Sequence, residues 1–396
     1  MSSFAADGNN GLFARAAAVR TLPGAVAGAF VAAVVGAFHN PATRGTAIAV
    51  ALTLPIVALT LPALWHMLLS PGSTFSAVSL AAAFVIAAAT IALRRRARGR
   101  RFSFRVLCRA IFPRWLVRSE STRADLGFCL LNTMTTGTLI GWAALSFPTV
   151  AHWANTALVA GLGPQPAPWV GPVGAATIET LAMFLAYELA YWLDHYLSHR
   201  IPFLWEFHRV HHTAETLSPF TVFRVHPIDS LVFYNIMILV MAPTSAMVEF
   251  LLGTGGHELQ LGGANIIILA YMLSTYHLQH SHMWIAFTGK LGRVLASPAH
   301  HQIHHSTDPA HFGQNLGAGL ALFDWLFGTL RIPQQRNEHL IFGVEPSQHA
   351  PHTIAGGLIT PFVRAFGTIV GPRRTVAAPG GVGVPTWQAP GHDIPA

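Results

Sequence analysis

The chain has 396 residues, of which 52% are hydrophobic and only 10% charged, and its formal net charge is +8. Soluble chains usually carry about 25% charged residues, so this composition argues against an ordinary soluble protein and favours an integral membrane protein. The two cysteines, Cys108 and Cys129, form no C-x2-C pair, which argues against a disulfide framework and against a thiolate metal site.

Composition divides the chain into six regions. They are, in order, a mobile polar leader (1–20), an N-terminal transmembrane block (21–93), a basic cytoplasmic connector (94–123), a histidine-bearing membrane domain (124–332), a segment that covers the cytoplasmic face (333–371) and a disordered tail rich in proline and glycine (372–396).

Several apolar runs are long enough to cross a bilayer, whose hydrocarbon core requires about 20 helical residues. They predict an all-α fold, an integral membrane helical bundle with a cytoplasmic helical cap. The expected spans are 22–38, 46–69, 75–93, 124–146, 173–194, 229–252 and 264–282.

Ten arginines lie between Arg94 and Arg118, directly after an apolar run. A basic run can indicate nucleic-acid binding, but this position favours a cytoplasmic loop that obeys the positive-inside rule and contacts anionic lipid. With that loop in the cytoplasm, the expected spans return every histidine cluster to the same side. The sequence therefore predicts a multi-pass protein with its histidine clusters on the cytoplasmic side and no nucleic-acid partner.

Histidines are concentrated in one part of the chain, where 15 of the 22 lie between residues 195 and 311. Three clusters have the spacing of one helix face, because positions i, i+3 and i+4 are neighbours on an α-helix. Each cluster is expected to aim its imidazoles at one spot, as metal ligands do. The clusters are His195 and His199 in DHYLSH, His208, His211 and His212 in HRVHH, and His301, His304 and His305 in HQIHH.

Two further histidines are candidate ligands, His226 in FRVHPID and His280 in HLQHSH. Eight to ten imidazoles are more than one tetrahedral metal needs, so we expect a polyhistidine site for two metal ions. Imidazole suits iron, zinc, copper and nickel. A set made only of imidazoles is atypical of a hydrolytic zinc site, which often keeps three ligands and a water molecule.

Ligating imidazoles usually donate their second N–H to a carboxylate or a carbonyl group. Glu188 lies seven residues before His195, on the same helix face and inside an apolar segment, where an ionisable group needs a partner. Asp194 directly precedes His195. We expect these two carboxylates to support the ligands.

The ordered motifs of residues 173–332 resemble the fatty acid hydroxylase/sterol desaturase superfamily of membrane-bound polyhistidine diiron oxygenases. The histidine clusters are shared with acyl-lipid desaturases and alkane hydroxylases. The HPID element at 226–229, Pro298 before His301, and the Asn-Leu-Gly and Phe-Gly-Thr elements that begin at Asn315 and Phe327 favour this superfamily.

The resemblance implies a fatty acid hydroxylase-like catalytic domain over 124–332. It implies two iron ions, cycling between Fe2+ and Fe3+, with O2 as cosubstrate, and hydroxylation or desaturation of a C–H bond in a lipid-like substrate. It carries ligand roles to the eight clustered histidines, supports His226 and His280 as ligands, and places Asn315 near the site as a hydrogen-bonding group.

Two partners are expected, a lipid-like substrate that enters from the bilayer and a separate electron-donor protein. The chain contains no iron–sulfur pattern, no glycine-rich dinucleotide fingerprint and no recognisable haem domain. A ferredoxin or rubredoxin with its reductase would then supply electrons. The alternatives are a membrane zinc hydrolase, which needs fewer ligands and no reductant, and a metal transporter or sensor, whose polar residues should lie within the membrane.

Overall fold

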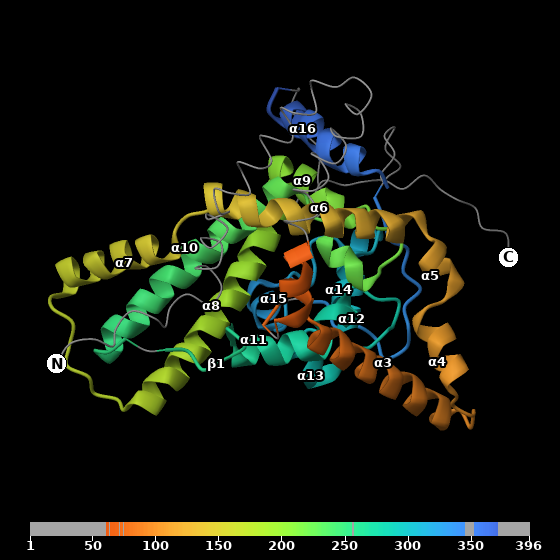
Figure 1. The fold of residues 1–396 in the computed structure, drawn as a ribbon, viewed down its shortest axis with the longest axis horizontal. Helices are drawn as coiled ribbons and strands as arrows, with labels where there is room; N and C mark the ends of the chain where they lie inside the picture. The colour runs from red at the N-terminus through yellow and green to blue at the C-terminus, as the bar shows by residue number, and fades with distance from the viewer. Residues whose placement is uncertain are drawn as a thin grey trace, which may run out of the picture.

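The computed structural model describes residues 61–344 and 352–370, except residues 63, 71, 74 and 256. This part of the chain is predominantly helical, which confirms the predicted fold class (Figure 1). The described residues also contain a small antiparallel hairpin of β1 (Gln260–Leu261) and β2 (Ala264–Asn265). Gly262 and Gly263 turn this hairpin with φ angles of 64° and 81°, a region that favours glycine.

The helices fall into three sets along the chain. The first set is α3 (Ala77–Ala97), α4 (Phe104–Ile111), α5 (Arg114–Arg118), α6 (Glu120–Ala143) and α7 (Phe147–Leu162). The second is α8 (Pro172–Arg200), α9 (Pro202–His212), the 3-10 turn η3 (Pro219–Phe223) and α10 (Pro227–Leu252). The third is α11 (Ile266–Tyr271), the π-helical turn η4 (Met272–Tyr276), α12 (His277–Gln279), α13 (Gly289–Val294), α14 (Pro298–His304), the 3-10 turn η5 (Pro309–His311), α15 (Leu322–Phe327) and α16 (Ile354–Val370).

Three helices in the described part are long and apolar enough to cross a membrane, namely α3, α8 and α10. They correspond to the expected spans 75–93, 173–194 and 229–252. The expected span 22–38 and most of 46–69 lie outside the described residues, as do the leader and the tail.

Two of the expected spans differ from the structure. The prediction of a continuous span over 264–282 is wrong, because the helix covers only Ile266–Gln279 and is interrupted by the π-turn η4. At about 1.5 Å per residue it is too short for a hydrocarbon core of about 30 Å. The region 124–146 forms α6, which is not among the three apolar helices. Its polar side chains bind the chain around η3, where the Asn132 amide donates to the carbonyls of Phe223 and Val225.

A sharp break separates α8 from α9. Ile201 has an extended conformation, with φ −93° and ψ 112°, and Pro202 begins the next helix. Proline disfavours the helical conformation in the preceding residue and cannot donate a helical hydrogen bond, so α8 ends here. The break turns the chain so that the histidines of α9 face those at the end of α8.

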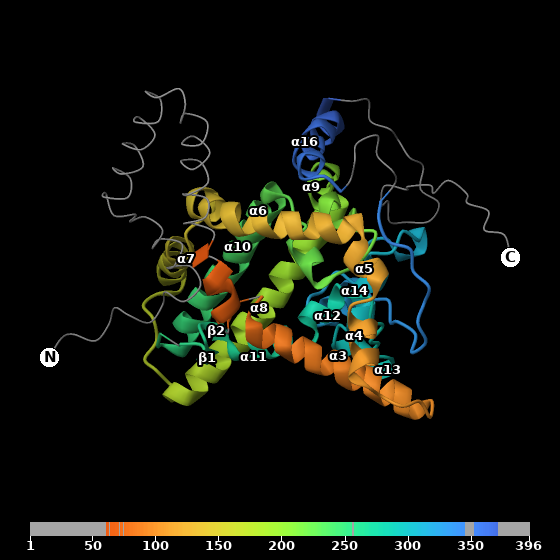
Figure 2. The same cartoon turned by 45° about the vertical axis from the view of Figure 1, so that its right-hand side comes forward.

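The helices α8 and α10 run side by side, and both reach the histidine region, α8 with its C-terminal end and α10 with its N-terminal end (Figures 1 and 2). The basic connector lies against the same region. The carbonyl of Ala110 is 2.7 Å from Nε2 of His282, and the guanidinium of Arg94 donates to the carbonyl of Trp284. The chain that directly follows His280 therefore contacts the arginine-rich connector.

Candidate metal centre

Four helical segments bring the histidines together. The last two turns of α8 carry His195 and His199, and the end of α9 carries the second cluster. His280 directly follows α12, and the third cluster lies on α14 and its C-terminal residue His305. Each of these side chains is buried.

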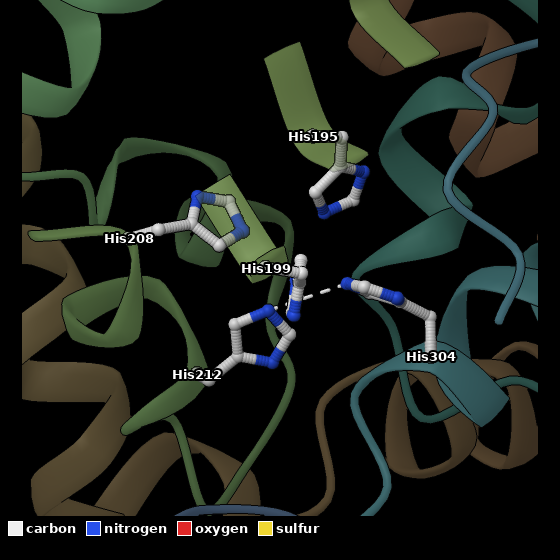
Figure 3. Close-up of side chains that lie close together, drawn as sticks. All are labelled: His195, His199, His208, His212 and His304. Carbon is white, nitrogen blue, oxygen red and sulfur yellow. Dashed lines mark hydrogen bonds between the residues drawn. The ribbon is translucent and has the colours of Figure 1, made fainter. Parts of the chain in front are cut away.

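Five of the histidines form a first group. Each offers one ring nitrogen, and these nitrogens all lie within 4.8 Å of one another. The Nε2 atoms of His212 and His304 are 3.2 Å apart, and Figure 3 shows the five rings converging on one point. We call this set group 1, and it consists of His195, His199, His208, His212 and His304.

The other four form a second group with the same property, here called group 2. Its nitrogens also lie within 4.8 Å of one another, and its members are His211, His280, His301 and His305. Nε2 of His280 lies 3.0 Å from Nε2 of His211 and 2.8 Å from Nε2 of His301. The two groups adjoin, since the ring centres of His212 and His305 are 4.5 Å apart.

The expectation that each cluster aims at one spot needs correction for α9 and α14. Helical positions are about 100° apart, so residues i and i+4 are offset by about 40° in one direction and residues i and i+3 by about 60° in the other. His208 and His212 accordingly share group 1, whereas His211 belongs to group 2. On α14 the pair His301 and His305 lies in group 2, and only His304 reaches group 1.

The ring nitrogens of group 1 suit a bound cation. Nδ1 of His195 lies 2.9 Å from the carbonyl oxygen of Leu316, and Nδ1 of His304 lies 2.9 Å from that of Gln314. A carbonyl oxygen can only accept, so both Nδ1 atoms carry the proton and both Nε2 atoms present a lone pair. Nε2 of His195, His199 and His208 is buried without a hydrogen-bond partner in the described part of the chain.

The lone pairs on Nε2 of His195 and His304 point into the same group, and lone pairs that converge in this way repel one another unless a positive charge lies between them. Metal–imidazole bonds of about 2.0–2.1 Å place ligand nitrogens about 3 Å apart. Burial lowers the pKa of His280 and of His304 to about 3, so both imidazoles are neutral, as ligands must be. The residues of both groups therefore fit a metal ion each.

Asp324 organises the segment that holds His195 and His304 in place. Its carboxylate accepts hydrogen bonds from the backbone N–H of Leu316 and of Gly317, each at 2.8 Å, and from the hydroxyl of Thr329 at 2.6 Å. The carbonyl of Leu316 is then free to accept from His195. Asp324 thus acts on the ligands through the backbone.

Glu188 has a similar role for the next residues of this loop. Its carboxylate accepts from the backbone N–H of Gly319 and of Leu320 at about 3 Å and does not touch the ligand rings. The close approach requires glycine, because a Cβ at position 319 would lie 3.0 Å from Glu188 and 2.9 Å from the ring of Tyr271. Glu188 therefore anchors α8 to the loop that carries the accepting carbonyls.

Asn315 and Asp194 lie near the groups, but neither side chain forms a hydrogen bond with a ligand nitrogen in the described part of the chain. Asn315 adopts a left-handed φ of 56°, its amide donates to the carbonyl of His300, and its side-chain oxygen accepts from the backbone of Arg331. Asp194 is buried close to Asp229, and its Oδ1 has no hydrogen-bond partner among the described residues.

His226 lies outside both groups and does not fit the predicted ligand role. Its Nδ1 accepts from the backbone of Ile228 at the start of α10, and its Nε2 lies 3.1 Å from the carbonyl of Leu358 in α16. Both nitrogens are therefore engaged elsewhere. Its neighbour Asp229 contributes instead, because Oδ2 of Asp229 lies 3.2 Å from Nδ1 of His208. The HPID motif contained this residue, but the sequence alone did not single it out.

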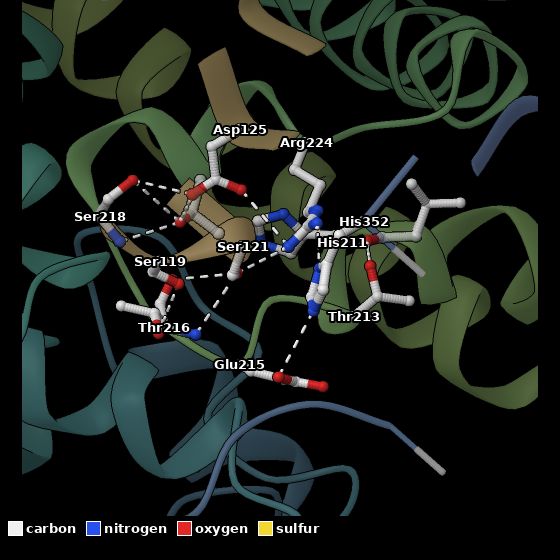
Figure 4. Close-up of polar contacts among 12 residues, drawn as sticks. Ser119, Ser121, Asp125, His211, Thr213, Glu215, Thr216, Ser218, Arg224 and His352 are labelled. Atoms are coloured by element: carbon white, nitrogen blue, oxygen red, sulfur yellow. Dashed lines mark hydrogen bonds and ion pairs between the residues drawn. The ribbon is translucent and has the colours of Figure 1, made fainter. Parts of the chain in front are cut away.

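A buried ion pair holds the chain between α9 and α10, beside group 2 (Figure 4). Nη1 of Arg224 lies 3.4 Å from Oδ1 of Asp125 on α6, and neither side chain is exposed. Oδ2 of Asp125 accepts from the hydroxyls of Ser218 and Thr221, and Nη2 of Arg224 lies 2.9 Å from Nδ1 of His352. This network, which sequence reasoning missed, fixes the chain that follows the histidines of α9.

Fold and site together define a helical membrane protein with a buried centre built only from imidazoles. The family model described as fatty acid hydroxylase matches residues 180–329. The resemblance to the fatty acid hydroxylase superfamily is thereby confirmed for this part of the chain, which contains every histidine of the two groups.

Curated relatives match the same part of the chain. This chain is 24% identical to alkylglycerol monooxygenase of Danio rerio over 164 residues, which cover 41% of this chain and 32% of that protein. The human alkylglycerol monooxygenase is 23% identical with the same coverage. Ornithine lipid hydroxylase OlsE of Rhizobium tropici is 28% identical over 160 residues, which cover 39% of this chain and 40% of that protein. The chain thus spans a third to two fifths of the length of these relatives, and no solved structure matches it.

Proposed function

We propose that this protein is a membrane-bound non-haem diiron oxygenase that hydroxylates or desaturates a C–H bond of a lipid-like substrate. The observation that carries the proposal is the pair of adjoining groups of buried imidazoles, nine in all, at the ends of two apolar helices. The fatty acid hydroxylase match supports this proposal, as do the relatives, which are a monooxygenase and a lipid hydroxylase.

Group 1 would hold one iron ion and group 2 the other. Two bound irons would supply the activation of O2 and the cleavage of an unreactive C–H bond. The chain's own residues prepare this site in two ways. Their burial excludes water, and the carbonyls of Leu316 and Gln314, together with Asp229, fix which nitrogen of His195, His304 and His208 faces the metal.

The electrons would come from a separate carrier protein, such as a ferredoxin or rubredoxin with its reductase. We place the two groups on the cytoplasmic side, because His282, two residues after His280 of group 2, bonds the carbonyl of Ala110 in the arginine-rich connector. Arginine-rich loops are retained in the cytoplasm. The substrate would enter from the bilayer between the apolar helices.

The metal identity is the first test. We expect about two irons per chain in protein purified without oxygen from iron-replete cells, with a Mössbauer spectrum of ligated iron. The His208→Ala variant should lose metal. The matched control is His282→Gln, since His282 lies outside both groups and bonds the carbonyl of Ala110.

Stoichiometric zinc without iron under these conditions would contradict the diiron assignment and favour a zinc hydrolase. The second test separates the reaction classes. Product formation from a membrane lipid extract should stop without O2 and without a reductant, whereas a hydrolase would continue under both conditions.

A further inference from the structure

The arginine-rich connector presents a positive surface that its own residues do not neutralise. Residues 94–118 contain ten arginines and no aspartate or glutamate. Arg105 and Arg109 are exposed one turn apart on α4, and Arg114 and Arg118 are exposed on α5. The arginine ion pairs in the described part of the chain involve other residues than these four. The surface therefore retains a charge that suits an acidic partner.

An exposed tryptophan lies among these arginines and reaches the chain beside group 2. Trp115 of α5 is 57% exposed. Its ring meets that of His282 edge to face, with ring centres 5.5 Å apart. Nε2 of His282 donates to the carbonyl oxygen of Ala110 in α4 at 2.7 Å, because a carbonyl can only accept. His282 is thereby held against both α4 and α5.

The segment that carries His282 is also fastened to the ligands of group 2. His280, two residues before it, belongs to that group. The buried amide of Gln302, which directly follows the candidate ligand His301, donates to the carbonyls of the residues on either side of His282 at 2.7 and 3.1 Å. A short path of fixed contacts therefore leads from the exposed ring of Trp115 to two imidazoles of group 2.

We propose that α4 and α5 form the docking surface for an acidic one-electron carrier protein of the ferredoxin class, and that Trp115 and His282 conduct its electrons to group 2. This inference rests on the proposed function, which requires electrons from a separate protein, and it names the place where they enter. Each turnover needs two electrons, so two reduced carriers would dock in succession. Each carrier would be oxidised by one electron as one of the two ferric ions of the centre is reduced.

The contact between Trp115 and His282 favours a carrier protein over anionic lipid at this surface. Lipid headgroups would bind the arginines without needing an aromatic ring that extends from the surface to the chain beside a candidate ligand. An electron donor benefits from such a ring, because electron transfer through protein slows steeply with distance. The connector lies outside residues 180–329, so this surface is not part of the family match.

The first test measures binding of a plant-type ferredoxin, an acidic iron–sulfur carrier, to the full-length protein in nanodiscs of neutral phosphatidylcholine. Calorimetry should show an affinity that falls as the salt concentration rises. Each exposed ion pair contributes modestly, so the variant Arg105→Gln/Arg109→Gln/Arg114→Gln should bind ferredoxin about tenfold more weakly. The matched control Arg105→Lys/Arg109→Lys/Arg114→Lys keeps the charge and should retain most of the affinity.

Equal affinity of the wild type and the glutamine variant for ferredoxin would overturn the docking surface. If the glutamine variant also lost phosphatidylglycerol that remains bound to the wild type in mass spectra, the arginines would be assigned to anionic lipid instead.

The second test follows the oxidation of saturating reduced ferredoxin by iron-loaded protein without O2. Trp115→Leu should slow this oxidation severalfold at unchanged metal content. The matched control is Trp153→Leu, because Trp153 on α7 is 63% exposed and α7 lies far from α5 (Figures 1 and 2). Equal rates in the two variants would overturn the route through Trp115.

Metal analysis and chemical reduction separate this inference from the proposed function. Diiron protein that is reduced chemically and then oxidises lipid when O2 is added, but whose glutamine variant binds ferredoxin like the wild type, would overturn the docking surface alone. Zinc protein without iron would overturn the diiron oxygenase. Ferredoxin binding that still depends on the arginines would leave the docking surface in place in that case, and its absence would overturn both.

Discussion

The helices that carry the histidines and the segments that connect them contribute differently to the centre. The regular helices α8, α9 and α14, counted with His305 at the C-terminal end of α14, supply eight of the nine grouped imidazoles. The spacings of these histidines are those that a helix dictates. The connecting segments 213–226 and 313–320 contain no grouped histidine, yet they are held by buried Arg224 and Asp324, and the carbonyl of Leu316 orients His195. Helices thus bring the ligands near one another, and irregular backbone sets which nitrogen each one presents.

The largest loss of stability should come from breaking the ion pair that holds segment 213–226. Arg224→Met leaves the carboxylate of Asp125 buried without its cation, which should cost about 3–5 kcal/mol of unfolding free energy. Denaturation of the purified protein in detergent measures this loss. Adding Asp125→Leu should recover most of it, and a double variant as unstable as the single one would contradict the ion-pair explanation.

The next largest loss of stability should come from removing the carboxylate that holds segment 313–320. Asp324→Asn replaces a carboxylate that accepts from two backbone amides and from Thr329, and hydrogen bonds to charged groups contribute about 1.5–3 kcal/mol. We expect a loss of about 2 kcal/mol of stability together with weaker metal binding. Asp308→Asn is the matched control, because its exposed side chain caps η5, asparagine caps equally well, and its one charged neighbour in the described part of the chain, Nε2 of His311, is 3.9 Å away. Equal effects in both variants would show that Asp324 has no special role.

Asp229 tests how an outer hydrogen-bond partner supports a single ligand, His208. In Asp229→Asn the negative charge beside Nδ1 of His208 is removed while the shape is retained. Loss of such an outer partner typically lowers metal affinity about 10- to 100-fold. Competition with a chelator measures the affinity, and an unchanged value would mean that Asp229 only packs against the ligand.

The last effect concerns pH in the metal-free protein. Burial lowers the pKa of His280 and of His304 to about 3, below the ordinary value of 6.5, so the unfolded chain binds more protons between these values. The stability contributed by each neutral histidine is complete above about pH 6.5 and falls by about 1.4 kcal/mol per pH unit as the pH decreases toward 3. Denaturation of the apo-protein at pH 7 and pH 5 should show this loss, and bound metal should reduce it. Equal stability at both values would contradict neutral burial.

The sequence by itself determined which residues could form the centre. Helical spacing marked His195 and His199 and the clusters on α9 and α14, because the periodicity of a helix is a local property. Apolar length likewise marked α3, α8 and α10. The motif order was sufficient to indicate the superfamily that the family model confirmed.

Only the tertiary structure decided how those residues are used. It assigned His211 to group 2 and His212 to group 1, and it engaged His226 in capping α10 and binding the carbonyl of Leu358. It also revealed the supporting carboxylates of Asp229 and Asp324, and it showed that the helix within 264–282 is too short to span a membrane. These features depend on contacts between residues far apart in the chain, and local periodicity contains no information about which distant carbonyl or carboxylate a side chain will meet.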